Sequence, residues 1–412
     1  MTISKINNFP ISFTLADGGL SWILFFSIVY QKLAPIGFMI MFISLFFQRY
    51  KSSKHDIKSY FLKGPAIWFI FYYLLLLIGM IWSENIPFGM QKLENKLTFL
   101  LFPVLYFFSA HKWGKSEWKE LIIWSLFFVL IIYELMAFWR FFSIPNQPWG
   151  YQFMESRFTL FMHRSYFACY LVIGIVLLIE NLLNYFSKWR FMLLLFFSIG
   201  IFQTGSKAGI VSLLLIVLVY IIKFAYSNTW KHLLPVISVF IFLTTLILFT
   251  NNPVKSRFTT TWSALNHVKL KENYSVESNT ARILMWNTSI NVWKDNFLLG
   301  VGTGDYDDEL TNLNIKYNNQ GVAKERLNSH NQFLNIAVQL GLLGLVVLLM
   351  IFYSCYYSSE KKLWQILILV VFFINLLVES FLETQAGIVL FCTLLLLFFS
   401  RKNTGELSIS EQ

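Results

Sequence analysis

The chain has 412 residues, of which 56% are hydrophobic and 13% are charged. A soluble protein carries about twice that share of charged residues. The composition therefore excludes an ordinary soluble enzyme and predicts an all-α, polytopic membrane protein rich in Phe and Trp. We attribute the net charge of +11 mainly to membrane topology and a preference for anionic lipid. Nucleic-acid binding is the weaker interpretation.

Apolar runs long enough to cross a bilayer recur along the whole chain. We predict about 12 transmembrane helices, since one span needs roughly 20 apolar residues and fewer where it is partly buried. They cover 11–30, 33–48, 65–82, 96–110, 120–142, 162–183, 190–204, 207–226, 232–250, 331–356, 363–379 and 384–400. The turn from Gln31 to Pro35 is very short, so the first two segments could instead form one kinked span.

Every second loop between the predicted spans is basic, as cytoplasmic loops are. The residues are Arg49, Lys51, Lys54, Lys58, Lys63, Lys112, Lys115, Lys119, Lys188, Arg190, Lys223, Lys231, Lys361, Lys362, Arg401 and Lys402. Both termini are therefore expected in the cytoplasm. We predict a single membrane domain over 1–412, with a long outer loop over 251–329 and a disordered cytoplasmic tail over 403–412. No small-residue cleavage site follows the first apolar run, so we expect that span to be retained.

Several cations break this pattern because they fall in loops on the outer side. Arg157, His163 and Arg164 precede the sixth span, Lys207 lies in the turn after the seventh, and Arg282 lies in the long loop. A cluster of outer cations needs an anionic partner, and a phosphate or pyrophosphate fits best. The alternative is that each cation pairs with a nearby carboxylate or with lipid phosphate.

The long outer loop carries further patterns. Residues 280–294 repeat apolar side chains at helical spacing, which predicts an amphipathic helix that is either a lid or a packing element. Glycines at 300, 302 and 304 permit a close backbone approach. The acidic run at 305–309 offers carboxylates, but nearby basic residues and solvent account for it, so we predict no metal.

A histidine stands where the loop meets the next apolar run. Ser329 and Gln332 have the spacing of a capping box, which predicts a helix that begins at His330. The positive end of a helix dipole disfavours a protonated imidazole there. A neutral histidine at a membrane boundary is well placed to accept a proton from a hydroxyl.

The helix after His330 has a face of small and polar residues. Ala337, Gly341 and Gly344 lie within roughly 40° of His330 on a helical wheel. An adjacent polar stripe consists of Asn331, Asn335 and Gln339. Polar groups rarely face lipid, so this side is expected to look into the bundle. Glu134, in the fifth span, is likewise expected to face the interior, and we assign it no chemical role.

These patterns resemble the O-antigen ligase and polymerase family. The signature that resembles it most is His330-Asn331 followed by Gly341 and Gly344. Arg282 with the glycine run at 300–304 is similar to the family's long periplasmic loop, and 379–387 is similar to its last outer turn. Residues 206–209 resemble its serine–arginine–small pattern, with Lys207 in place of arginine. The likeness covers about residues 157–400.

The resemblance implies a GT-C glycosyltransferase in the bacterial inner membrane, with a periplasmic site, no cofactor and an inverting mechanism. The donor would be a glycan on undecaprenyl pyrophosphate. His330 would be the general base, Arg282 and Lys207 would hold the pyrophosphate, and Arg157 or Arg164 would complete that site. Asn331, Gly341 and Gly344 would support the histidine.

The acceptor separates two activities within this family. A ligase would use a sugar hydroxyl of lipid A–core, and we place it ahead of an O-antigen or exopolysaccharide polymerase, which would use a lipid-linked repeat. A transporter or flippase of the same lipid is the alternative from another class. We see no internal repeat typical of transporters, and the polar residues gather at one membrane face. A structural scaffold would leave the outer cations unexplained.

Overall fold

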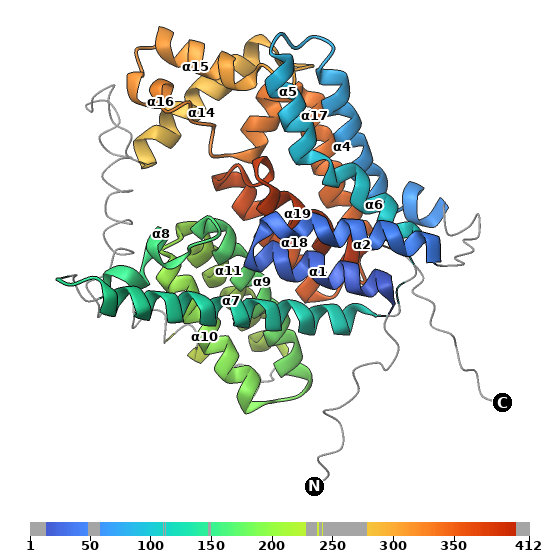
Figure 1. Cartoon of the computed structure of the whole chain (residues 1–412), viewed down its shortest axis with the longest axis vertical. Coiled ribbons are helices and arrows are strands. Elements are labelled where there is room, and N and C mark those ends of the chain that lie inside the picture. Colours follow the sequence, from blue (N-terminus) through green and yellow to red (C-terminus); the bar gives the residue numbers. More distant parts are fainter. Residues whose placement is uncertain are drawn as a thin grey trace.

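The computed structural model describes residues 14–47, 58–109, 111, 113–146, 150–227, 237–238, 241 and 278–400. Within these ranges the regular elements are all helices, and no strand occurs. Figure 1 shows a bundle of apolar helices with a smaller helical group, α14 to α16, at one end. The predicted all-α class is confirmed for this part of the chain.

The helices follow the predicted apolar segments. The first half contains α1 (Leu15–Val29), α2 (Ala34–Phe47), α4 (Ala66–Gly79), α5 (Ile86–Lys96), α6 (Thr98–Phe108), α7 (Lys115–Ser143), α8 (Glu155–Phe158), α9 (Arg164–Asn184) and α10 (Lys188–Thr204). The second half contains α11 (Lys207–Ser227), α14 (Ser278–Asp295), α15 (Tyr306–Lys316), α16 (Gln320–Lys324), α17 (Gln332–Ser358), α18 (Leu363–Val378), the short 3₁₀ helix η5 (Phe381–Glu383) and α19 (Gln385–Phe399).

Among the described residues, four helices are long and apolar enough to cross a membrane: α7, α9, α11 and α17. Shorter apolar helices include α1, α2, α4, α18 and α19. These lengths support a membrane protein, while the number of spans stays a prediction. The predicted tail 403–412 lies outside the described residues, as does the predicted segment 232–250 apart from 237–238 and 241.

The first two predicted segments form a hairpin rather than one kinked span. A short 3₁₀ turn, Gln31–Leu33, separates α1 from α2. The two helices approach closely at Gly19 and Gly37, where an added Cβ on Gly19 would lie 2.8 Å from the Gly37 carbonyl oxygen. A side chain at either position would force the helices apart, so the glycines allow the tight return.

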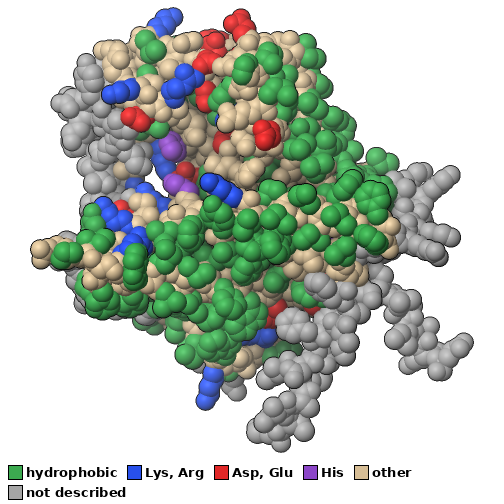
Figure 2. Space-filling view, viewed as in Figure 1, with side chains coloured by type: hydrophobic (Ala, Val, Ile, Leu, Met, Phe, Trp, Pro, Cys, Tyr) green, Lys and Arg blue, Asp and Glu red, His purple; other side chains and the backbone are tan. Residues whose placement is uncertain are grey.

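Burial separates central helices from peripheral ones. In the apolar stretch of α9, 83% of the residues are buried, whereas 44% are buried in that of α7. The exposed side chains of α7 include Phe128, Trp139 and Phe142. Figure 2 shows hydrophobic side chains over the face formed by α1, α2 and α7. Such a face suits contact with lipid, whereas α9 is enclosed by other helices.

α17 is broken in its middle at Gly341, which has a φ of 62°. The loop after α14 fills the break: the amides of Val301 and Gly302 donate to the carbonyls of Val338 and Gln339 (2.9 and 3.1 Å). A Cβ at Gly341 would lie 2.3 Å from the Leu298 carbonyl oxygen. Gly341 was expected on a regular helical face that looks into the bundle. That prediction is wrong, because the residue leaves the helical conformation to accept a loop.

The predicted helix at 280–294 exists as α14, but a different face packs inward. The buried apolar residues are Ala281, Met285 and Val292, which pack with α15 and α17. Ile290, from the predicted apolar stripe, is 37% exposed. Trp293, from the same stripe, is partly buried and packs against these residues, so only part of the stripe lies toward the outside of the protein.

Candidate functional site

His330 lies just before α17 rather than inside it. Asn331 is the N-cap, and its side-chain oxygen accepts from the amides of Phe333 and Leu334 (2.9 and 3.1 Å). The predicted start at His330 is therefore wrong, because the Asn331 amide caps the helix in place of the Ser329–Gln332 box. His330 has a left-handed backbone, with a φ of 46°, and its N–H donates to Asn328 Oδ1 (2.9 Å). Left-handed residues other than glycine are uncommon and gather at functional sites.

A carboxylate faces the imidazole. His330 Nδ1 lies 3.6 Å from Oε2 of Glu379, the residue that ends α18. This is an ion-pair distance rather than a hydrogen bond, and such contacts often shorten when substrate binds. The sequence argument considered only the helix dipole at this histidine. The structure adds a negative charge close to Nδ1 of the ring.

Glu379 connects the histidine to Arg282. Its Oε1 accepts from Arg282 Nη2 (2.6 Å) and from the Ser165 hydroxyl (3.1 Å). Burial alone would raise the pKa of Glu379. The contact with His330 and the charges of Arg282 and His163 outweigh burial and lower that pKa to about 2. Glu379 is therefore an anion that contacts both His330 and Arg282.

Arg282 keeps donor capacity beyond Glu379. Its side chain is 24% exposed, and its Nε–H is buried without a hydrogen-bond partner among the described residues. Lys207, at the start of α11, donates to Asn279 Oδ1 (2.8 Å). Asn279 and Arg282 are three residues apart on α14 and so share a helix face. The structure thus brings Lys207 near Arg282, as the predicted anion site requires.

His163 is a further member of the cluster. It caps α9 and keeps an exposed surface. The surrounding protein nevertheless desolvates the ring enough to lower its pKa. The positive charges of Arg164 and Arg282 lower that pKa further, and the charge of Glu379 opposes this effect. The sequence placed His163 among the outer cations without assigning it a role.

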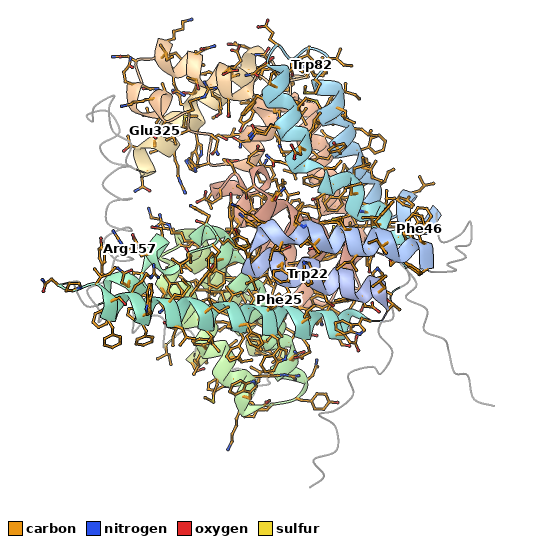
Figure 3. All side chains as sticks on the ribbon, viewed as in Figure 1. Trp22, Phe25, Phe46, Trp82, Arg157 and Glu325 are labelled. Atoms are coloured by element: carbon orange, nitrogen blue, oxygen red, sulfur yellow. The ribbon has the colours of Figure 1, made fainter. Side chains whose placement is uncertain are left out.

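The two arginines before α9 differ in their contacts. Arg164 lies 3.8 Å from Glu155 and acts electrostatically on His163. Arg157 stacks on the ring of Tyr151, 3.7 Å from its centroid, and is exposed. Figure 3 shows Arg157 and Glu325 on opposite sides of the opening between α8 and α16. Arg164 is thus tied to the histidine cluster, and Arg157 lies at its border.

Histidine and basic side chains gather in a surface hollow between the α14–α16 group and the α7–α8 region (Figure 2). The polar stripe of α17 lies deeper. Asn335 accepts from the Ser329 amide (3.2 Å), and Gln339 donates to the Thr303 carbonyl (3.0 Å). Both side chains are buried, as predicted for an inward-facing stripe. Gly344 is also buried, and it packs on Leu340 of its own helix.

A second carboxylate, Glu383, lies four residues after Glu379 in a closed cluster. It contacts Lys96 (2.8 Å) and Lys92 (3.1 Å), and Gln332 donates to it (3.3 Å). Burial opposes the charged form, but the two lysines lower the pKa of Glu383 to about 2. Sequence reasoning missed Lys92 and Lys96. Lys92 lies in an outer loop by our own topology, so the rule that selected Arg157 and Arg164 applied to it, whereas Lys96 is the first residue of the predicted span 96–110.

The acidic run at 305–309 has partners in the protein. Asp305 accepts from the amides of Glu84 and Asn85 (2.8 and 2.7 Å). Asp308 accepts from the side chains of Asn85 and Arg326. These carboxylates join the loop after α4 to α15, which gives them a structural role. In the described part of the chain, no group of three or more metal-ligating side chains is found.

Comparison with known protein families gives a match to the region that contains Lys207, Arg282 and His330. Residues 191–349 match the family model described as O-antigen ligase. The sequence resemblance is confirmed over this stretch, which covers less than half of the chain and includes Lys207, Arg282 and His330. The match is consistent with a glycosyl-transferring role in general. No curated protein matches the chain.

The matched region accounts for part of the site only. Arg164 and Glu379 lie outside the O-antigen ligase match, yet they act on His163 and His330 respectively. The helices that bring them there are α9 and α18, which pack against each other. The membrane helices around the matched region therefore complete the charge cluster.

Proposed function

We propose that the chain transfers a glycan from undecaprenyl pyrophosphate to a sugar hydroxyl of lipid A–core at the periplasmic face of the inner membrane. The observation that carries this proposal is the shared carboxylate. Glu379 holds His330 and Arg282 at one turn beside the outer hollow. A base and a phosphate-binding cation must lie this close for direct displacement at a sugar carbon. The O-antigen ligase match supports the general class of reaction.

His330 acts as the general base in this proposal. With Nδ1 directed to Glu379, Nε2 accepts the proton of the acceptor hydroxyl. The hydroxyl oxygen then bonds to the anomeric carbon as the bond from that carbon to the pyrophosphate oxygen breaks. The electron pair of that bond leaves on the pyrophosphate. General-base assistance contributes roughly 10²–10⁴ in rate.

Arg282 and Lys207 stabilise the leaving pyrophosphate in this proposal. Arg282 has an unpartnered Nε–H and reaches Glu379 through Nη2, so its planar group can bridge the carboxylate and a phosphate. Lys207 supplies a compact second charge. Arg164 completes the site rather than Arg157, since Arg164 acts on the histidine cluster. Fixed cations can replace a metal here because they neutralise charge where it develops.

Transfer with a defined donor and two acceptors tests the proposal. Purified full-length protein is given the undecaprenyl pyrophosphate-linked glycan with either lipid A–core or a second lipid-linked repeat. We expect product on lipid A–core, and product only on the second repeat would identify a polymerase. Donor that crosses liposomes without any new glycosidic bond would identify a flippase. Transfer is expected to survive EDTA, and loss restored by a divalent ion would contradict the metal-independent mechanism.

A further inference from the structure

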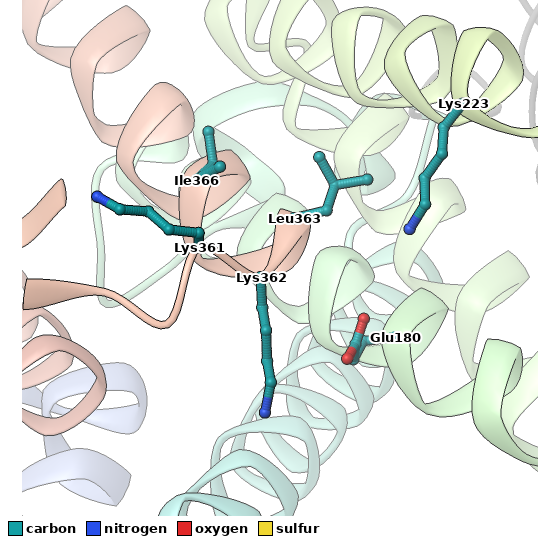
Figure 4. A pocket seen from close by; sticks show the side chains of 6 residues that line it. All are labelled: Glu180, Lys223, Lys361, Lys362, Leu363 and Ile366. Carbon is teal, nitrogen blue, oxygen red and sulfur yellow. The ribbon is translucent and has the colours of Figure 1, made fainter. Parts of the chain in front are cut away.

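A basic pocket of about 530 Å³ lies away from the histidine cluster. Its lining combines three lysines, one carboxylate and two apolar side chains: Glu180, Lys223, Lys361, Lys362, Leu363 and Ile366. Figure 4 shows Glu180 on α9, Lys223 on α11, and the other four residues at the start of α18 and in the segment just before it. Lys223 extends toward Glu180, and the Lys361 side chain points away from both. The proposed glycan transfer uses none of them.

The pocket lies at the opposite end of three helices from His330. Each of these helices has one end near His330 and Glu379 and the other end at the pocket. The pairs of residues at the two ends are Arg164 and Glu180 for α9, Lys207 and Lys223 for α11, and Glu379, directly after α18, and Leu363 for α18. The residues of each pair are 16 positions apart, or roughly 24 Å along a helix. This length approaches the roughly 30 Å of a bilayer's hydrocarbon core. The pocket is thus at the other membrane surface.

Charge in the pocket favours an anion. Lys223 is exposed and forms no ion pair within the described residues. Lys362 pairs with Glu360 (2.7 Å), which also contacts Lys115 (2.5 Å), so one carboxylate serves two lysines. Glu180 is the single carboxylate in the lining, against three lysines. The pocket therefore has positive charge that the protein does not neutralise.

We propose that this pocket binds the phosphate of an anionic phospholipid in the leaflet opposite His330. Lys223 and Lys362 contact the phosphate, while Leu363 and Ile366 contact the apolar part just below the headgroup. Glu180 accepts hydrogen bonds from headgroup hydroxyls, as a glycerol headgroup supplies. Basic pockets between membrane helices at the cytoplasmic surface are suited to such lipids. The apolar wall at a membrane surface favours a lipid over a soluble phosphate.

Native mass spectrometry of the purified full chain, titrated with phosphatidylglycerol, tests this site. Lys223→Gln and Lys362→Gln should each weaken the first bound lipid about fivefold, as expected for one lysine near an anionic surface. Lys188→Gln is the matched control, because it removes one exposed charge at the same predicted face outside the pocket. Equal weakening in Lys188→Gln, or no weakening in Lys223→Gln, would overturn the proposal.

Two further measurements distinguish a bound lipid from a soluble anion and define the role of the carboxylate. Soluble glycerol phosphate should not displace the lipid at equal concentration, and full displacement would identify a free anion as the ligand. Glu180→Gln should reduce the preference for phosphatidylglycerol over phosphatidic acid, which lacks headgroup hydroxyls. An unchanged preference would reject that role. Lys223 is exposed, so the melting temperature of Lys223→Gln should match wild type and exclude misfolding as the cause.

Discussion

Glu379 and Glu383 lie on the same turn but have opposite surroundings. Glu379 binds Arg282 and faces His330, whose side chains are 24% and 31% exposed. Glu383 binds Lys92 and Lys96, whose side chains are 13% and 0% exposed. Both carboxylates are nearly buried, at 7% and 6%. The two carboxylates are therefore equally buried, and they differ in which side chains they contact and in how far those side chains are exposed to water.

Access decides what each cluster can do. The Arg282 side chain is 24% exposed and pairs with Glu379 through Nη2, so a ligand can add to the Glu379 cluster without breaking it. Lys96 is fully buried and already divides its contacts between Glu383 and Gln339 (2.8 and 3.3 Å). The Glu383 cluster joins α5 to α17 and η5. We interpret the first cluster as chemical and the second as structural.

The largest expected effect is the loss of transfer in His330→Ala. Removing the base should lower kcat by roughly 10²–10⁴, because general-base assistance is worth that much. The melting temperature should change little, since the imidazole is 31% exposed. Rates come from the in-vitro transfer assay with lipid A–core.

The backbone at this position calls for a second variant. Asparagine tolerates the left-handed conformation of His330 better than alanine does, so His330→Asn separates loss of the base from backbone strain. Near wild-type turnover in both variants would exclude His330 as the base.

The converse variant is Lys96→Met, which targets the closed cluster. Removing one partner of a buried ion pair costs about 3–5 kcal/mol, and here the loss should lie near the lower figure because Lys92 remains. Thermal unfolding in detergent measures it. Lys92→Met, whose ammonium is more exposed, should destabilise less. If Lys96→Met melts like wild type yet cannot transfer glycan, the assigned roles of the two clusters are reversed.

Arg282→Lys tests whether a planar guanidinium is needed beside Glu379. The lysine keeps the charge but loses the donors that bridge carboxylate and phosphate, so kcat/KM should fall roughly tenfold without a change in melting. Arg326→Lys is a suitable control, because Arg326 also pairs with a carboxylate, Asp308, but on the exposed surface. Equal losses in both variants would argue against a specific phosphate contact.

Acid should reduce the stability of the fold gradually, because both carboxylate clusters lose their charge as the pH falls. The pKa values of Glu379 and Glu383 are lowered to about 2, below the roughly 4.3 of an unfolded chain. A depressed carboxyl pKa stabilises the fold above the unfolded value and loses that effect as pH falls toward 2. The melting temperature should therefore drop between about pH 4.5 and 2. Glu383→Gln should show a shallower drop, and an unchanged slope would contradict the assignment.

The sequence predicted the helices well because membrane spans depend on local apolar length. Every predicted span that lies wholly or largely within the described residues coincides with a helix. His330, Arg282 and Lys207 were selected from local position and charge, and the structure places them in one region. Their proposed chemical roles remain predictions, as do the donor, the acceptor and the periplasmic location.

The partners of these residues could not be predicted from spacing alone. Glu379 lies 49 positions after His330, so only the packing of α17, α18 and α9 shows that they meet. The helix start was misplaced because two capping arrangements, at Ser329 and at Asn331, fit the same five residues. The break at Gly341 depends on hydrogen bonds to a distant loop. Lys92 was missed although the topology rule applied to it, and Lys96 was missed because it falls at the start of the predicted span 96–110.

The break in α17 also fixes which amide hydrogens exchange together. The amides of Leu342 and Leu343 donate to the carbonyls of Phe297 and Leu298 instead of to their own helix. Their protection from deuterium therefore depends on a segment more than 40 positions earlier in the chain. Deuterium uptake at these two amides would therefore report that residues 297–302 have detached from α17, even while the helical turns on either side of the break remain formed.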